Sequence, residues 1–381
     1  MEMSNAHRTT SRSVVLREFN KPLALEELDV AEAGPGEVVV EVEYGGVCGT
    51  DAHLWSGRLD IPTPVVLGHE GLGTVERIGT DGLADANGDP LTVGDTVMWA
   101  SSISCGSCVP CRMHEEPTLC ERRTTYGVNL PVPDAPGPSG SWSERMVLRA
   151  GTSVVKLPTG VTPTSAMSLA CAGPTMIHAL YGRRPVRLGE SVVVQGSGPV
   201  GLAAAAMAQL AGASRVIVVG GPESRLAVAR RLGFGDHHIN IIDGTGATAA
   251  LAEVRALTGG YGADLVIECA GAPDAVPQGM AMARRGGSYL VVGQYTDRGE
   301  VAVNPHQLVH RQLSLLGSGG FTGAHLVAYV NLLAALTARF DLASLVTEFP
   351  MADCEEALRQ VGTGRVLKAV LRPYGRENDI R

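Results

Sequence analysis

The sequence lacks a surplus of positive charge. Its 381 residues contain 31 Lys and Arg against 39 Asp and Glu, which gives a formal net charge of −8. Proteins that bind nucleic acid or an anionic membrane surface carry an excess of basic residues. We therefore expect no nucleic-acid partner and no membrane partner.

Long hydrophobic runs are missing as well. The longest uncharged stretch, residues 191–214, is broken by four glycines, Pro199 and two glutamines, a pattern typical of strand, turn and helix rather than of a membrane span. Residues 1–12 are polar and lack the apolar core of a secretion signal. Four of the eight cysteines fall within sixteen residues, which in a reducing cytosol is more typical of a metal site than of disulfides. We expect a cytoplasmic protein.

Glycine, by contrast, is unusually common. It makes up 48 of the 381 residues, about 13% against an ordinary ~7%, and no collagen-like period accompanies it. Such an excess predicts many tight turns and close backbone approaches. The hydrophobic share of 45% is ordinary for a globular protein, and the length suits about two domains.

The chain up to about residue 182 is rich in valine, glycine and turn residues. Short strands are predicted at residues 37–43 and 94–99, and a turn at residues 87–90. Residues 121–140 carry many prolines and predict an irregular loop. These features indicate a mainly β domain at residues 1–182.

The chain from residue 183 to 322 has a different pattern, in which short β-branched runs alternate with alanine-rich helical segments. Strands are predicted at 191–195, 215–219, 264–268 and 288–292, and helices at 200–211 and 224–232. Such alternation predicts an α/β domain with a doubly wound parallel sheet covered on both faces. Residues 323–381 begin with an amphipathic helix and end in a strand, and we expect them to return to the first domain.

A glycine-rich loop follows the first predicted strand of the α/β domain. Gly196, Gly198 and Gly201 form a G-x-G-x-x-G pattern that includes Pro199 and Val200 and opens a helix. The first glycine permits a sharp turn, the second lets the backbone approach a pyrophosphate, and the third lets helix and strand pack closely. The helix N-terminus then offers N–H groups to the phosphates. The sequence predicts a nicotinamide dinucleotide site here.

The end of the second strand does not decide between NAD and NADP. An NAD-preferring site usually has a carboxylate there to accept both ribose hydroxyls. This chain has Gly220 at that point, with Glu223 slightly later and Arg225 after it. Arg225 is a candidate for pairing with a 2′-phosphate or for contacting the adenosine of either cofactor, so both cofactors stay open.

A set of four cysteines predicts a metal site. Cys105, Cys108, Cys111 and Cys120 follow one another at intervals of three, three and nine residues. Zinc bound by four thiolates has no open position for chemistry. We therefore expect a structural zinc that fixes a loop.

Three further segments carry candidate metal ligands with hydroxyl, carboxylate and imidazole groups close behind. They are residues 46–53 (GVCGTDAH), 68–70 (GHE) and 169–175 (LACAGPT). Taken one at a time each has an ordinary explanation, because a lone cysteine is most often a small core residue and a lone histidine a satisfied polar one. Spacing alone does not join them.

With these motifs the sequence resembles the zinc-dependent medium-chain alcohol dehydrogenases, over nearly the whole chain from Val14 to Pro373. The carrying motifs are GVCGTDAH, GHEGLG (68–73), CGSCVPC (105–111), LACAGPT and GSGPVG (196–201). The resemblance implies a GroES-like catalytic domain with a structural zinc loop beside a Rossmann domain. It also implies a homodimer or homotetramer.

The same resemblance implies a catalytic zinc on Cys48, His69 and Cys171, with water or a substrate oxygen in the fourth place. Glu70 would lie near the metal as an occasional alternative ligand. Asp51 would orient the imidazole of His69. Cys120 follows one residue later than is usual in the family, and a longer turn lies around residues 84–90; neither changes these assignments.

For the reaction, the resemblance implies that Thr50 bonds the substrate hydroxyl and that His53 passes its proton to solvent. Thr175 would border the nicotinamide, and Lys368 would touch the cofactor phosphates. The expected activity is hydride transfer between NAD(P) and an alcohol, aldehyde or ketone, with zinc polarising the substrate oxygen. The alternatives are an enoyl or quinone reductase of the same fold and a non-catalytic dinucleotide-binding scaffold.

Overall fold

The computed structural model describes residues 9–80, 82–135, 137–244 and 246–374, so most of the polar segment at residues 1–12 lies outside the described residues. Contacts divide the chain into two compact units. One comprises residues 1–170, 322–334 and 342–381, and the other residues 171–321 and 335–341. Among the described residues, no helix has the length and apolar character that crossing a membrane requires.

The second unit is built on a six-stranded sheet in which all neighbouring strands are parallel. In spatial order the strands are β13 (His237–Asn240), β12 (Arg215–Gly220), β11 (Ser191–Gln195), β14 (Ala263–Glu268), β15 (Ala283–Val291) and β16 (Ser314–Gly317). From β11 the chain runs outward to β13 and then restarts on the other side with β14. This order confirms the predicted doubly wound Rossmann sheet.

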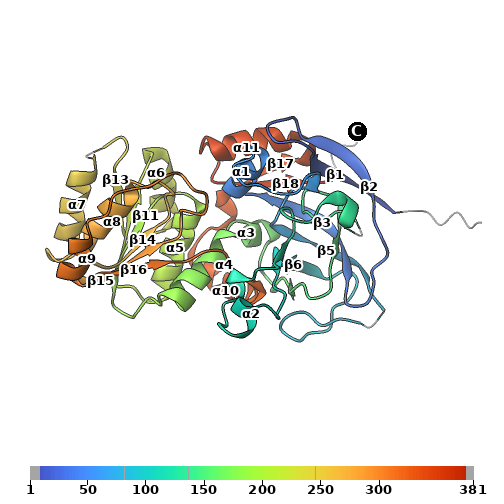
Figure 1. The fold of residues 1–381 in the computed structure, drawn as a ribbon, viewed down its shortest axis with the longest axis horizontal. Helices are drawn as coiled ribbons and strands as arrows, with labels where there is room; N and C mark the ends of the chain where they lie inside the picture. Colours follow the sequence, from blue (N-terminus) through green and yellow to red (C-terminus); the bar gives the residue numbers. More distant parts are fainter. Residues whose placement is uncertain (1–8, 81, 136, 245, 375–381) are drawn as a thin grey trace, which may run out of the picture. The chain divides into compact units, whose positions relative to one another are not determined.

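Helices connect these strands and lie on both sides of the sheet (Figure 1). They are α5 (Pro199–Leu210), α6 (Glu223–Leu232), α7 (Gly246–Leu257), α8 (Ala275–Met282) and α9 (Pro305–Arg311), preceded by α4 (Ala172–Ile177) and the π-helical turn η3 (His178–Arg183). The small alanine side chains of α5 let it approach closely, and residues 201–209 of this helix are buried. A helix that is apolar on all sides is stable only when it is covered on all sides.

The first unit is mainly antiparallel β-structure, as the sequence predicts. Its largest sheet contains, in order, β10 (Val154–Lys156), β6 (Thr96–Trp99), β5 (Gly71–Ile78), β3 (Val38–Val47), β18 (Lys368–Arg372) and β17 (Val346–Pro350), with β9 (Arg145–Leu148) also paired to β3. A second sheet contains β2 (Ala24–Asp29), β1 (Thr10–Leu16) and β4 (Val65–Val66), and β7 (Ser102–Ile103) pairs with β8 (Thr124–Thr125).

Short helices complete the first unit. They are α1 (Gly49–Trp55), α2 (Val109–Arg112), α3 (Pro163–Met167) and α11 (Cys354–Gly362), together with much of α10 (Gly323–Arg339) and the 3-10 turns η1 (Pro117–Leu119), η2 (Val132–Asp134), η4 (Ala343–Leu345) and η5 (Met351–Asp353). One core cluster surrounds the fully buried Trp142. The proline-rich residues 121–140 hold only β8 and η2 among their described residues, in line with the predicted loop.

The C-terminal segment returns to the first unit through β17 and β18. Ala369 of β18 pairs with Val47 of β3, directly before the first predicted zinc ligand. The two units change over between residues 170 and 171 and between 321 and 322, whereas the boundaries predicted after residues 182 and 322 stay predictions. Residues 335–341 belong to the second unit, where Phe340 stacks on Phe234 with ring centroids 4.7 Å apart.

Candidate metal centres and dinucleotide-binding loop

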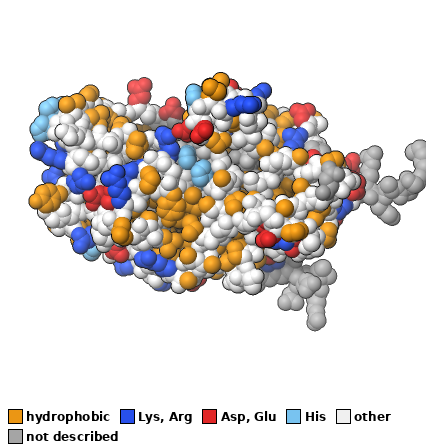
Figure 2. Space-filling view, turned by 90° about the horizontal axis from the view of Figure 1, so that it is seen from below, with side chains coloured by type: hydrophobic (Ala, Val, Ile, Leu, Met, Phe, Trp, Pro, Cys, Tyr) orange, Lys and Arg blue, Asp and Glu red, His pale blue; other side chains and the backbone are white. Residues whose placement is uncertain are grey.

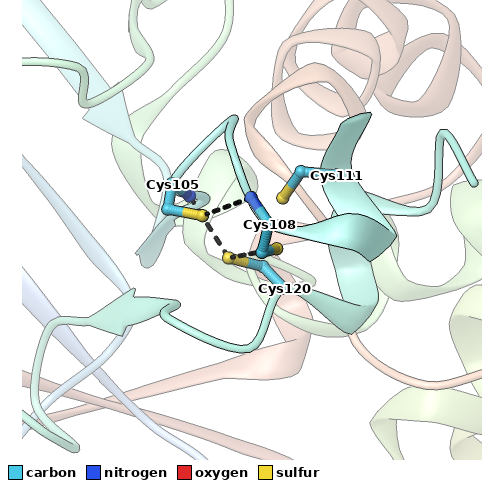
Figure 3. A group of neighbouring side chains, drawn as sticks. All are labelled: Cys105, Cys108, Cys111 and Cys120. Atoms are coloured by element: carbon cyan, nitrogen blue, oxygen red, sulfur yellow. Dashed lines mark hydrogen bonds between the residues drawn. The ribbon is translucent and has the colours of Figure 1, made fainter. Parts of the chain in front are cut away.

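The four clustered cysteines come together at one point (Figure 3). Their sulfur atoms all lie within 4.8 Å of one another. Cys105 accepts a hydrogen bond of 3.4 Å from the Cys108 backbone N–H, and Cys120 accepts one of 3.2 Å from the Cys105 N–H. The turn η1 lies in the nine-residue interval before Cys120, so the extra residue is absorbed without moving this sulfur away from the others.

The chemistry of this cluster fits a closed zinc site. Four thiolates are a common donor set for structural zinc. The backbone N–H groups of Ser107 and then Cys108 lower the pKa of the Cys105 thiol to about 5, so this sulfur is ionised at neutral pH. Arg122 lies beside it, with Nη2 3.6 Å from Cys105 Sγ and donating to Ser107 Oγ at 2.7 Å. A guanidinium here offsets the negative charge that four thiolates leave on a zinc ion.

A second group of possible metal ligands is formed by Cys48, His69, Glu70 and Cys171, whose ligand atoms also lie within 4.8 Å of one another. Cys48 precedes α1 at the end of β3, and His69 and Glu70 lie between β4 and β5. Cys171 is the residue directly after Ala170, at which the first segment of the first unit ends, and it precedes α4. The structure thus brings together three segments that the sequence spacing left separate.

Asp51 fixes the orientation of two of these ligands. One carboxylate oxygen accepts a 2.8 Å hydrogen bond from the Cys48 backbone N–H, and the other lies 3.1 Å from His69 Nδ1. Asp51 is fully buried. Burial lowers the pKa of His69, but the Asp51 carboxylate and then Cys48 raise it well above its usual value. The contact with Asp51 fixes one ring proton on Nδ1, so a metal at this site would replace the second ring proton, on Nε2.

Glu70 provides the test of whether the group fits a metal. The carboxylate is almost completely buried, and one oxygen is ion-paired with Lys368. The other oxygen, Oε1, has no hydrogen-bond partner among the described residues and lies 3.9 Å from His69 Nε2. An unsatisfied buried carboxylate oxygen is costly, and a cation beside it would satisfy it. Two sulfurs, one nitrogen and one oxygen form a donor set that zinc accepts.

The pairing of Glu70 with Lys368 was not foreseen from the sequence. We expected Lys368 at the cofactor phosphates, and this role stays a prediction, but the structure buries its ammonium against Glu70 across 298 residues of sequence. Such a contact leaves no periodic or local signal. It arises because β18 lies next to β3, where Gly46 leaves room that a Cβ would take from the Glu70 carboxylate.

Lys368→Met is therefore expected to lower the free energy of unfolding by about 3 kcal/mol, because removing one partner leaves a buried charge uncompensated. Urea denaturation of the zinc-loaded protein measures the effect. Lys156→Met is the matched control, since this lysine pairs with Asp95 at 2.9 Å but is partly exposed, and its loss should cost less than about 1 kcal/mol. Unchanged stability together with a weaker affinity for the dinucleotide would contradict the pairing and leave Lys368 to the cofactor phosphates.

Thr50 and His53 lie on α1, directly after Cys48. They are three residues apart on this helix, so their side chains lie on the same side of it. Thr50 Oγ1 is 3.9 Å from Cys48 Sγ, and both Thr50 and His53 are half-buried. The hydroxyl is therefore next to the candidate metal ligands, and the imidazole follows one turn further along the helix.

The glycine-rich loop has the backbone geometry that the motif requires. Gly196 has a φ of 120°, and a Cβ there would contact the backbone of Cys269. A Cβ on Gly201 would overlap the carbonyl of Gly196. Gly198, which precedes Pro199 and Val200 at the start of α5, has only Arg225 Nη1 nearby, 4.0 Å from the position of an added Cβ. The approach to the first turn of α5 is thus open to a phosphate, which fits a dinucleotide.

The end of β12 leaves the choice of cofactor open in the structure too. Gly220 is its last residue and carries no side chain to bind a ribose. The Glu223 carboxylate accepts hydrogen bonds of 3.2 Å from both Arg230 and Asn240. Burial lowers the pKa of Arg225.

Thr175, the residue predicted to border the nicotinamide, lies on α4. It donates its hydroxyl proton to the Cys171 carbonyl at 2.8 Å.

Comparison with known proteins identifies the class to which this fold and these sites belong. Residues 34–159 match the family described as alcohol dehydrogenase GroES-like domain, and residues 199–335 match the one described as zinc-binding dehydrogenase. The chain is 33% identical to the 5-exo-hydroxycamphor dehydrogenase of Pseudomonas putida, over 95% of this chain and 98% of that protein. The chain belongs to the zinc-dependent alcohol dehydrogenases of the medium-chain type.

Two further relatives agree with this membership. The sorbitol dehydrogenase of Halalkalibacterium halodurans is 31% identical, over 92% of this chain and 95% of that protein. The crystal structure of an alcohol dehydrogenase from Thermotoga maritima superposes with a TM-score of 0.90 at 31% identity, covering 96% of this chain and 100% of that one. The chain is accordingly a zinc- and NAD(P)-dependent oxidoreductase that interconverts small alcohols with aldehydes or ketones.

Proposed function

We propose that Cys48, His69 and Cys171 hold the catalytic zinc of this oxidoreductase, with Glu70 as an occasional further ligand. The observation that carries this assignment is the convergence of the four ligand atoms within 4.8 Å of one another. Cys105, Cys108, Cys111 and Cys120 hold a second, structural zinc, and no position in that set is left for a substrate.

The bound zinc supplies a Lewis acid that polarises an alcohol or carbonyl oxygen, and the nicotinamide ring accepts or donates the hydride. The chain's own residues position these groups and move the proton. Asp51 holds His69 and the Cys48 backbone in place through its two oxygens. Lys368 keeps one oxygen of Glu70 engaged, and the other, Oε1, has no hydrogen-bond partner among the described residues.

Thr50 is placed to accept the proton of the substrate hydroxyl in a hydrogen-bonded chain, because its Oγ1 lies beside the ligand Cys48. His53, one turn further along α1, would pass this proton to solvent. An imidazole suits the step, since its ordinary pKa lies near neutrality. Reduction of a carbonyl compound uses the same residues in the opposite order.

The dinucleotide is assigned to the loop of Gly196, Gly198, Pro199, Val200 and Gly201. Its phosphates would meet the N–H groups at the start of α5. Gly220 and Arg225 would flank the adenosine ribose, and Thr175 the nicotinamide. Arg225 supports NADP, because it is a candidate for pairing with a 2′-phosphate. The absence of an arginine directly after β12 supports NAD, so the cofactor preference is left to the experiment below.

The two competing functions lack a supporting observation. A zinc-free enoyl or quinone reductase has no use for the ligands Cys48, His69 and Cys171, which converge here. A scaffold that had lost its chemistry would show a broken ligand set or a broken proton path, whereas Thr50, Asp51 and His53 all accompany the ligands.

We also propose that the protein works in the cytoplasm as a homodimer or homotetramer. None of the eight cysteines, all of them among the described residues, forms a disulfide, which suits a reducing compartment. The oligomeric state rests on the resemblance alone, and light scattering of the purified protein measures it.

A panel of alcohols, aldehydes and ketones with NAD and NADP in turn tests the function. Because the relatives include enzymes named for hydroxycamphor and for sorbitol, the panel contains a bicyclic secondary alcohol and a polyol beside simple primary alcohols. We expect a change in absorbance of reduced nicotinamide with at least one alcohol, and its reversal with the matching carbonyl compound. Failure of every substrate with both cofactors, in protein shown to contain zinc, would favour the scaffold.

A further inference from the structure

A cavity lies in the parallel-sheet unit, away from the glycine-rich loop. It has a volume of about 280 Å³ and is lined by Arg255, Gly260, Tyr261, Arg284, Arg285 and Arg311. These six residues are called the arginine pocket below. Arg284 and Arg285 follow the first residue of β15, and Gly260 and Tyr261 come just before β14. The glycine-rich loop follows the last residue of β11. The pocket therefore lies at the N-terminal ends of β14 and β15, and the glycine-rich loop lies at the C-terminal end of β11. Because all these strands are parallel, the two ends are on opposite sides of the sheet, and the pocket is separate from the dinucleotide site.

The pocket collects positive charge near the ends of three helices. Arg255 is in the last turn of α7, Arg311 is at the end of α9, and Arg284 and Arg285 are in β15, two and three residues after the last residue of α8. A single arginine at a helix C-terminus has a structural explanation, because it interacts favourably with the negative end of the helix dipole. That explanation accounts for each arginine by itself. It does not account for four of them around one cavity in a chain of net charge −8.

The positive charge in the pocket is only partly neutralised. Among the described residues, Arg284 has an acidic partner, Asp264, which accepts a 2.6 Å hydrogen bond from its Nε. Arg311 donates to the carbonyls of Met280 and Ala283, which are uncharged. The exposed side chains of Arg255 and Arg285 make no hydrogen bond or ion pair with any residue that the structure describes. Asp264 and three helix ends of about half a charge each therefore leave an excess of positive charge.

The arginines also act on one another. Burial lowers the pKa of Arg311, and the charges of Arg255 and Arg285 lower it further. Like charges held this close are destabilising unless an anion joins them. Figure 2 shows several Lys and Arg side chains, with an acidic patch among them, at the end where α7 and α9 lie in Figure 1.

We propose that the arginine pocket binds a short chain of phosphates, either free inorganic polyphosphate or the phosphate tail of a nucleotide. Guanidinium groups bind phosphate oxygens through paired, charge-assisted hydrogen bonds. A chain of two or three phosphates offers charged oxygens to arginines that come from different helices. The cavity volume of about 280 Å³ is just below the range of about 300–1,000 Å³ for small-molecule sites, which suits a phosphate chain rather than a whole nucleotide.

Tyr261 distinguishes the two sources of such a ligand. Its side chain is 80% exposed, and it is held in a tight turn in which the Gly260 N–H donates to the Arg255 carbonyl at 2.7 Å. An exposed aromatic ring beside a phosphate site is able to stack on a nucleotide base. A nucleotide should therefore gain affinity from Tyr261, whereas inorganic triphosphate should not.

Isothermal titration calorimetry of the full-length, zinc-loaded protein tests the proposal, with the glycine-rich loop saturated by oxidised dinucleotide. Inorganic triphosphate and ATP are the probes. Arg255→Gln/Arg285→Gln removes the two arginines that lack partners among the described residues, and we expect the affinity to fall about tenfold for each, because each change removes charge-assisted hydrogen bonds to the phosphates. Arg187→Gln/Arg231→Gln removes two other exposed arginines of the same unit and should change the affinity less than twofold.

The variant Tyr261→Ala distinguishes a nucleotide from inorganic polyphosphate as the source of the phosphate chain. Tighter binding of ATP than of triphosphate, lost in Tyr261→Ala, would identify a nucleotide as the ligand. Equal affinities, unchanged in Tyr261→Ala, would identify inorganic polyphosphate. No heat of binding with either probe at about 1 mM would overturn the proposal, because it excludes a site. An equal loss of affinity in Arg255→Gln/Arg285→Gln and Arg187→Gln/Arg231→Gln would overturn it too, because binding would then depend only on general surface charge.

Discussion

Cys48→Ser is expected to lower kcat by at least about a thousandfold, since it removes a ligand of the metal that polarises the substrate oxygen, an effect of several kcal/mol. Serine is neutral at physiological pH and is a poor zinc ligand, so the zinc content should fall from two ions per chain to one. Initial rates on the best alcohol of the panel and metal analysis of the purified variant measure both effects.

Two comparisons make this result specific to the metal site. Dinucleotide affinity, followed by fluorescence titration, should change little, because the glycine-rich loop and Cys48 belong to different compact units. Cys354→Ala is the matched cysteine control: this thiol is buried in a core cluster outside both ligand groups. Turnover of Cys48→Ser within a few-fold of the parent protein, with both zinc ions retained, would refute the catalytic assignment.

Cys111→Ser should have the second large effect, on stability rather than on chemistry. The loop at residues 105–120 has almost no core of its own. Helix α2 has no buried residue, and Val109, Met113 and Leu119 are between 53% and 74% exposed. A loop of this kind depends on its metal, and structural zinc contributes about 10–16 kcal/mol in small zinc-finger peptides.

We therefore expect Cys111→Ser to lose one zinc per chain and to lower Tm by about 10 °C or more. Hydrogen exchange should show lost protection at residues 105–120, while the zinc held by Cys48 is retained. Ser107→Ala keeps all four sulfurs and removes only the hydroxyl that lies 3.7 Å from Cys105 Sγ, so it should lower Tm by less than about 3 °C. Normal protection of this loop in a variant that has lost the zinc would contradict the structural role.

Local patterns were enough to predict the architecture. The run at 191–195 and the valines within residues 37–43 are β-branched, and the structure places β11 and β3 there. The alanine-rich pattern that begins at residue 200 corresponds to α5. These elements are predicted by the periodicity of hydrophobic residues and by the glycines in the turns between them, both of which are visible in a single sequence.

The candidate catalytic site needed more than local patterns. Cys48, His69 and Cys171 are separated by long stretches of chain, and only the resemblance joined them before the structure did. The Glu70–Lys368 pair and the arginine pocket gave no signal, because each depends on which strands and helices become neighbours in space. Side-chain partners of this kind follow from tertiary packing, which periodicity does not encode.

The position of β18 has a consequence for synthesis of the protein. Lys368 of this strand is translated 298 residues after its partner Glu70, and the strand lies between β3 and β17 in its sheet. A nascent chain that has already exposed Cys48 and His69 must hold β3 without this neighbour until β18 has been translated. Loading of a metal on those residues should therefore wait for β18, and termination before this strand should yield a product with an unpaired edge at β3 and an uncompensated buried carboxylate.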